Sequence, residues 1–179
     1  MTLARIFPFL TLAAVFAVGA ATPVKNKVVE IKLVMSRDGA HAYFDPAGVH
    51  IQPGDTVRWM QVRDYHSVTA YHPSNSNHEL RIPDGAEPWN SDILLGQYPA
   101  KGSTFQRRFT DEGVYDYFCQ PHEAAGMVGR IIVGKPGAGP GTRPFGYAPE
   151  RKWNPVPAAA QKQFPDIEEI MRKGAVPAH

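Results

Sequence analysis

The sequence predicts an all-β sandwich followed by a Pro/Gly-rich C-terminal extension that ends in a short helix. Of the 179 residues, 43% are hydrophobic and 20% are charged, which is typical of a soluble globular core and excludes a disordered chain. Between residues 28 and 133, β-prone runs alternate with turn signals roughly every eight to twelve residues, as in antiparallel sandwiches and barrels. Eleven of the 24 residues from 134 to 157 are Gly or Pro, a composition that favours an extended connector over a sheet.

The first half of the predicted sandwich is marked by alternation and by tight turns. Val28–Met35 is rich in β-branched residues and predicts a strand. Val57, Trp59 and Gln61 alternate along the next strong candidate, Thr56–Val62, and would share one face. The remaining signals are Tyr43-Phe44, the turn at Asp45-Pro46, the alternating pair Val49 and Ile51, the turn Pro53-Gly54-Asp55, and the β-prone run His66–Tyr71.

The second half begins with a segment that does not read as a strand. Residues 73–97 are rich in Pro, Gly and Asn and predict an excursion loop or a short helix. Strands are then expected at Ser103–Phe109, Val114–Cys119 and Met127–Val133, with a turn at Asp111-Glu112-Gly113 between the first two.

Helical periodicity first occurs in the extension. Asp166 can cap a helix, Glu169 stands three residues later as in a capping box, and Gly174 can end it. Its apolar face would carry Ile167, Ile170 and Met171. Because the segment is too small to fold alone, this face either docks on the sandwich or meets a partner. We expect a signal peptide at residues 1–21, a β domain at 24–134 and the extension at 135–179, with its helix at about 166–173.

The N-terminus predicts export. A short basic lead, Met1–Arg5, precedes the apolar stretch Ile6–Val18 and the small residues Gly19, Ala20 and Ala21. This stretch is shorter than the ~20 apolar residues that a spanning helix needs, so it is read as a secretory signal. The alternative is an uncleaved anchor. After Val24 no segment is long and apolar enough to cross a membrane.

Charge and cysteine content exclude several classes of function. Nineteen Lys and Arg against 17 Asp and Glu give a net charge of +2, and there is no basic run to suggest nucleic acid. The single cysteine, Cys119, excludes an internal disulfide, a Cys₄ zinc site and a cysteine-ligated iron–sulfur cluster. A free thiol in an oxidising compartment is safe when it is buried or bound to a metal.

The candidate chemistry lies in the segment FCQPHEAAGM. Cys119, His122 and Met127 form a Cys-x₂-His-x₄-Met array between two predicted strands. Thiolate, imidazole and thioether are soft to borderline ligands, which select copper over calcium, magnesium or manganese. A blue-copper arrangement needs a second imidazole to complete a His₂Cys plane, with Met as a weak axial ligand.

His66 is the preferred source of that imidazole. It opens a predicted strand directly after a turn, so it can lie at the same end of the sandwich as Cys119. His72 and His78 are the competitors, in a polar segment where we expect both at the surface, and His72 is the alternative ligand.

The stretch from about Val28 to Val133 resembles a cupredoxin of the plastocyanin, pseudoazurin and amicyanin group. The matching segments are YFDPAGVHIQPGDTVRWMQVRDYHSVTA and GVYDYFCQPHEAAGMVGRIIV. The resemblance implies a Greek-key β-sandwich, and it implies that His66, Cys119, His122 and Met127 hold one type 1 copper ion that cycles between Cu(I) and Cu(II). Ser67 departs from the family pattern, because many relatives carry Asn after the first ligand histidine. Its hydroxyl can still make a bracing hydrogen bond, with fewer donors.

The resemblance implies a periplasmic one-electron carrier rather than an enzyme. With four ligands from the protein, no coordination site is open for a substrate. A cytochrome or an oxidase is the expected partner, docking near His122, whose loop neighbours are small or apolar. Pro88, Trp89 and Leu94 or Leu95 are candidates to widen this patch, although the two leucines are expected to pack in the core. The alternative function is a copper-binding accessory, storage or delivery protein of a respiratory oxidase, against which stands the lack of a Met-rich or His-rich tract.

Overall fold

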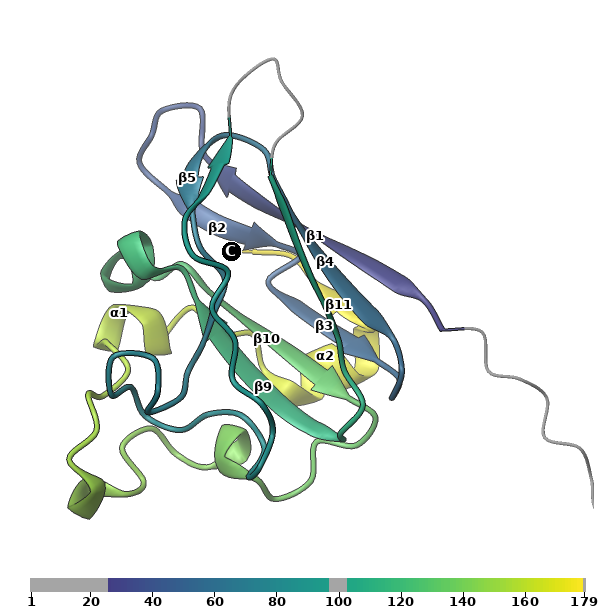
Figure 1. Ribbon diagram of the computed structural model, residues 1–179, viewed down its shortest axis with the longest axis vertical. Helices are drawn as coiled ribbons and strands as arrows, with labels where there is room; N and C mark the ends of the chain where they lie inside the picture. Colours follow the sequence, from purple (N-terminus) through teal and green to yellow (C-terminus); the bar gives the residue numbers. More distant parts are fainter. Residues whose placement is uncertain (1–25, 97–102, 179) are drawn as a thin grey trace, which may run out of the picture.

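The computed structural model describes residues 26–96 and 103–178, so the predicted signal segment lies outside the described residues. It shows a β-sandwich with the C-terminal extension wrapped along one sheet (Figure 1). The sandwich consists of β1 (Val28–Met35), β2 (Ala42–Asp45), β3 (Gly48–Ile51), β4 (Thr56–Gln61), β5 (Asp64–His66), β6 (Thr69–Ala70), β7 (Leu94–Gly96), β8 (Thr104–Arg108), β9 (Gly113–Phe118), the 3-10 helix η1 (Gln120–Ala125) and β10 (Val128–Val133). The extension contains η2 (Pro140–Thr142), η3 (Pro149–Arg151), α1 (Ala158–Gln161), α2 (Ile167–Lys173) and β11 (Ala175–Val176).

The two main sheets are mixed rather than antiparallel. One has the strand order β2-β1-β4-β8 and the other β11-β3-β10-β9-β6, while β5 and β7 form a separate ladder. β1 and β4 run parallel, as do β3 and β10. The expectation of an antiparallel sandwich is therefore wrong for these two pairs. Their strands are not neighbours in sequence, and the long connections between them allow parallel pairing, which a hairpin cannot make.

The core between the sheets is built by alternating side chains. Along β4, Val57, Trp59 and Gln61 are buried and their neighbours are half-buried, so the predicted shared face is confirmed. The Trp59 ring meets the Tyr117 ring of the opposite sheet edge-on, with 5.5 Å between centroids. Burial of such aromatic side chains supplies much of the driving force for bringing the two sheets together.

The extension covers the outer face of the second sheet. Every residue of β9 and β10 is buried. In a sheet with one face in water, every second residue of a strand would be exposed, so both faces of this sheet must be covered. Val114 and Ile132 pack with Ile170 and Val176, and β11 adds an edge strand antiparallel to β3. A second cluster beside the first comprises Tyr71, Phe118, Val128, Val156 and Ala160. The apolar face of the extension therefore docks on the sandwich (Figure 1).

Several local predictions can be compared directly with the structure. α2 begins after Asp166, whose carboxylate accepts the N–H groups of Glu168 and Glu169, so the predicted helix and its cap are confirmed. Met171 is exposed rather than part of the docked face. Residues 73–96 form a loop that ends in β7 and contain no helix. None of the helices in the described ranges has the length and hydrophobicity needed to cross a bilayer.

Candidate metal centre

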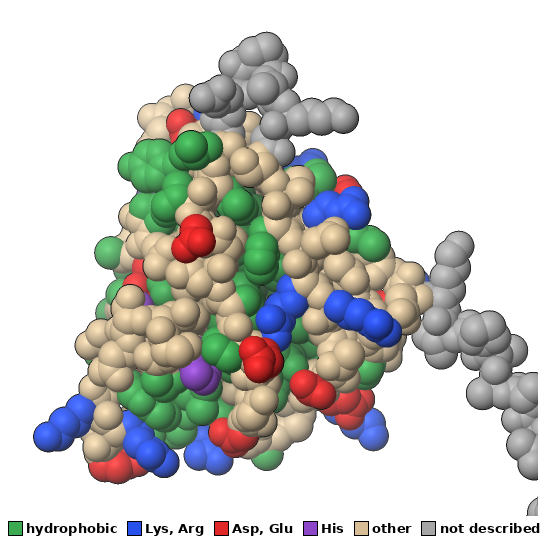
Figure 2. All heavy atoms as spheres, viewed as in Figure 1, with side chains coloured by type: hydrophobic (Ala, Val, Ile, Leu, Met, Phe, Trp, Pro, Cys, Tyr) green, Lys and Arg blue, Asp and Glu red, His purple; other side chains and the backbone are tan. Residues whose placement is uncertain are grey.

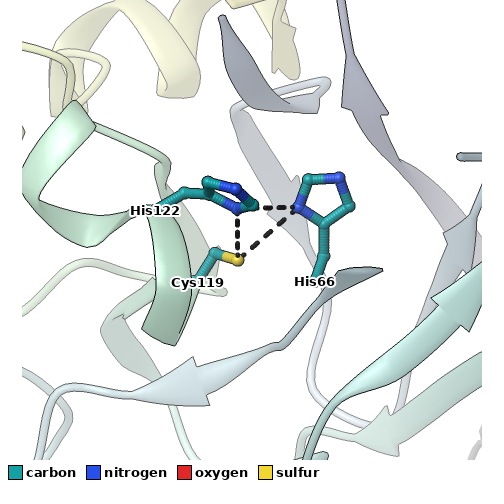
Figure 3. A group of neighbouring side chains, drawn as sticks. All are labelled: His66, Cys119 and His122. Atoms are coloured by element: carbon teal, nitrogen blue, oxygen red, sulfur yellow. Dashed lines mark hydrogen bonds between the residues drawn. The ribbon is translucent and has the colours of Figure 1, made fainter. Parts of the chain in front are cut away.

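Three of the predicted site residues converge at one end of the sandwich (Figure 3). His66 ends β5, Cys119 directly follows β9, and His122 lies in η1. Pro121 lies within the first turn of η1, and Gly126 ends it at a φ of 96°, a left-handed conformation that favours glycine. The loop thereby turns back so that the Cys119 N–H donates to the Met127 carbonyl at 3.0 Å.

The donor atoms form a nearly equilateral triangle. The Nδ1 atoms of His66 and His122 lie 3.2 Å apart, and the Cys119 Sγ lies 3.6 Å from the first and 3.4 Å from the second. The point equidistant from all three is about 2 Å from each, which is close to the length of metal–nitrogen and metal–thiolate bonds. The donors are thus already spaced for a metal ion.

Burial sets the protonation of the site. Burial, together with the charge of His122, lowers the pKa of His66 to about 4. The pKa of His122 is also lowered, again by burial. Burial raises the pKa of the Cys119 thiol to about 11, against the opposing effect of the Ser67 N–H. Both imidazoles therefore stay neutral at pH 7 and offer lone pairs, whereas metal binding must release the thiol proton.

Ser67 connects the two halves of the site. Its N–H donates to the Cys119 Sγ at 3.3 Å, and its hydroxyl accepts the Gln120 N–H at 2.8 Å. The hydroxyl also pairs with Thr69, which donates to the Asn90 side chain at 3.1 Å. The two hydrogen bonds of Ser67 thus join the end of β5 to the ligand loop. Thr69 and Asn90, which extend this network, could not be identified from the sequence.

Met127 and the competing histidines occupy different surroundings. Met127 is fully buried directly before β10, in the same core cluster as Cys119. His72 bonds to Ser74 in its own turn, away from the triangle. The expectation of a surface position is wrong for His78, whose side chain is 13% exposed and faces Glu123 of the ligand loop. Among the described residues, the cluster of His, Cys, Asp or Glu side chains that could hold a metal ion is His66, Cys119 and His122.

The chemistry of the donor set fits copper. A thiolate and two imidazoles in one plane, with a buried thioether at the end of the same loop, match the ligand preferences of copper. The donors would also bind Zn²⁺, which takes the same atoms in tetrahedral geometry. The comparisons with known proteins favour copper.

The copper-binding protein family of plastocyanin and azurin matches residues 31–134. Pseudoazurin of Methylorubrum extorquens is 30% identical over 131 residues, covering 72% of this chain and 78% of the relative. Chloroplastic plastocyanin of Tetradesmus obliquus is 32% identical over 124 residues, covering 68% and 77%. The crystal structure of pseudoazurin from Methylobacterium extorquens AM1 superposes with a TM-score of 0.52 at 27% identity, covering 75% of this chain and 91% of that one. The chain is a cupredoxin and belongs to the plastocyanin/azurin family of copper-binding proteins.

Proposed function

We propose that the protein is a one-electron carrier in which His66, Cys119 and His122 hold one copper ion and Met127 is a weak axial ligand. The observation that carries this proposal is the donor triangle of two imidazole nitrogens and one thiol sulfur, whose sides are 3.2, 3.6 and 3.4 Å. A copper ion bound there would supply a Cu(I)/Cu(II) couple. Because β5, β9 and η1 hold the donor residues, these side chains need to move little when a bound copper ion gains or loses an electron.

The surroundings of the site favour a carrier over an enzyme. His66 and Cys119 are fully buried, and only His122 is partly exposed. With four protein ligands, a substrate would find no free position. An electron can enter or leave through the exposed edge of His122, which supports a docking surface for partners around that residue.

An apolar surface lies beside His122. Tyr65 and Leu95 are register partners on β5 and β7, 52% and 60% exposed, and the expectation that Leu95 is in the core is therefore wrong. The Tyr65 ring lies 5.6 Å from the His122 ring between centroids. Val62 and Ile93, in the segments that lead into β5 and β7, are also exposed, and Figure 2 shows hydrophobic side chains gathered over this part of the molecule. A small apolar surface next to a redox site suits a brief encounter with a cytochrome or an oxidase.

We propose further that the protein works in the periplasm. The basic lead, the apolar stretch and the small residues of 1–21 support export, with 24–134 as the cupredoxin domain and 135–179 as its extension. The fold keeps its single thiol fully buried, which protects it from oxidation in such a compartment.

Redox titration of the copper-loaded protein, followed by challenge with a copper chelator, tests the proposal. We expect a reversible one-electron couple, unchanged over repeated cycles, and metal that the chelator removes slowly from the buried site. Colourless copper that passes at once to the chelator, with no reversible couple, would contradict the carrier and support copper delivery.

A further inference from the structure

A second polar cluster surrounds Glu123 on the ligand loop. Glu123 directly follows His122, and its side chain is only 14% exposed. One carboxylate oxygen accepts the Tyr71 hydroxyl at 2.8 Å and the other accepts the His78 Nε2 at 3.1 Å. A carboxylate that is buried to this extent is uncommon unless hydrogen-bond partners replace the water that it has lost.

The partners fix the protonation state of His78. Its Nδ1 lies 2.6 Å from the Asn75 carbonyl oxygen, which can only accept a hydrogen bond. Since the Glu123 carboxylate is also an acceptor, both contacts are hydrogen bonds when both ring nitrogens carry protons. Burial lowers the pKa of His78, but the bonds to Glu123 and to the Asn75 carbonyl outweigh it, and the net pKa is raised. The contact is therefore a charge-assisted pair.

Tyr71 attaches Glu123 to the sandwich. Tyr71 is fully buried, its N–H donates to the Asp116 carbonyl at 3.1 Å, and its ring packs on Phe118 with 4.5 Å between centroids. Phe118 is the last residue of β9, directly before Cys119.

His78 attaches Glu123 to the extension. His78 forms a β-bridge with Asn154, and the Glu79 N–H donates to the Asn154 carbonyl at 3.0 Å. The Asn154 N–H donates in turn to the Asn77 carbonyl at 2.8 Å. The segment that presents His78 is thus hydrogen-bonded to the extension on both sides of the histidine.

The extension also meets the ligand loop directly. α1 contacts η1, and a Cβ added to Gly126 would lie 2.8 Å from the Gln163 Cγ. The loop is consequently enclosed between the sheet and the extension. Glu123 is the charged group of the loop that bonds to Tyr71 beside the sheet and to His78, whose segment is in turn bonded to the extension.

We propose that Glu123 is a positioning residue, which fastens the ligand loop to Tyr71 and His78 so that the C-terminal extension determines how rigidly His122 is held. This role rests on the proposed function of His122 as a ligand. The rigidity itself is a property of the chain and can be measured without copper, so the two proposals can fail separately.

Amide hydrogen exchange, measured by NMR on the metal-free chain, tests the positioning role. Glu123→Gln keeps the shape of the side chain but removes its charge and one acceptor oxygen. Glu112→Gln, in the exposed turn before β9, is the matched control. The reporters are the N–H groups of Gly126 and Met127, which donate to the carbonyls of Glu123 and His122. We expect exchange at both to become at least tenfold faster in Glu123→Gln and to stay unchanged in Glu112→Gln.

Core amides separate positioning from a general loss of stability. The Ile131 N–H in the β9–β10 ladder should keep its wild-type exchange rate in Glu123→Gln. Equal acceleration of loop and core amides, or no acceleration in the loop, would overturn the proposal. Tyr71→Phe removes one donor without changing charge and should reproduce the loop-specific effect, and it decides the matter if Glu123→Gln does not fold.

A copper-loaded readout completes the test. The EPR spectrum of Glu123→Gln with Cu(II) should show a broadened or second copper signal, because a looser His122 samples more than one geometry. A single spectrum identical to that of Glu112→Gln, together with unchanged loop exchange, would assign Glu123 no positioning role. Failure of the wild type to bind copper would refute the carrier and leave the exchange result standing.

Discussion

Asp116 offers the sharpest test of how the extension is attached. It lies fully buried in β9 and accepts hydrogen bonds from two arginines. Arg130 donates to both of its oxygens, at 2.7 and 3.0 Å, and Arg81 donates from Nε at 3.0 Å. The same guanidinium groups reach the extension through the carbonyl oxygens of Gly141, Arg143 and Pro165. Asp116 thus compensates the charge of Arg130 and shares that of Arg81 with the buried Glu79, whose carboxylate lies 3.2 Å from the Arg81 Nη1.

Asp116→Asn should destabilise the metal-free protein by about 3–5 kcal/mol, because it leaves the buried Arg130 without its counter-charge and Arg81 with Glu79 alone. With an m-value of about 2 kcal/mol per molar urea, the midpoint would fall by roughly 2 M. Glu30→Gln is the control, since Glu30 is 51% exposed and pairs with Arg58 at 3.4 Å. An exposed pair of this kind is worth about 0–1 kcal/mol. A loss in Asp116→Asn no larger than in Glu30→Gln would refute the reasoning.

Three further predictions follow from the same structure. His66→Ala should destroy the blue copper site while His72→Ala leaves it intact, as absorption spectra of the copper-loaded variants would show; the reverse result would make His72 the ligand. Ile170→Ala should cost about 2–4 kcal/mol in urea unfolding, because Ile170 is fully buried against the sheet, and a cost below about 1 kcal/mol would mean that α2 is not firmly docked. Because the pKa of His78 is raised in the fold, its contribution to stability is complete below about pH 6.5 and is lost as the pH rises through the raised pKa. His78→Gln should remove that decline, and an unchanged pH profile would show that the pair with Glu123 does not form.

Local patterns predicted much of the sandwich, because strand signals are local. The predicted limits Val28–Met35 coincide with β1, and the alternation in β4 identifies its buried face. β11 could not be predicted, since two residues carry no periodicity and become a strand only through pairing with β3. The parallel pairing of β1 with β4 likewise depends on the path of the whole chain.

The residues of the site also differ in how far the sequence alone could identify them. Cys119 and His122 are three residues apart, and their chemistry is legible in the loop itself. His66 was inferred from the imidazole that this loop lacks, and the structure brings it to the triangle. The role of His78 was missed because its partner, Glu123, lies 45 residues away, and a polar segment rich in Asn and Ser reads as surface. Long-range polar pairs of this kind leave no local signal.

The most direct test of the central claim combines absorption and EPR spectra of the copper-loaded chain with those of Cys119→Ala. The donor triangle predicts one copper per chain, an intense visible band from charge transfer between the thiolate and Cu(II), and the small copper hyperfine splitting of a type 1 site. Both features should vanish in Cys119→Ala. A wild-type chain that takes up no copper, or a variant that keeps the band, would contradict the account.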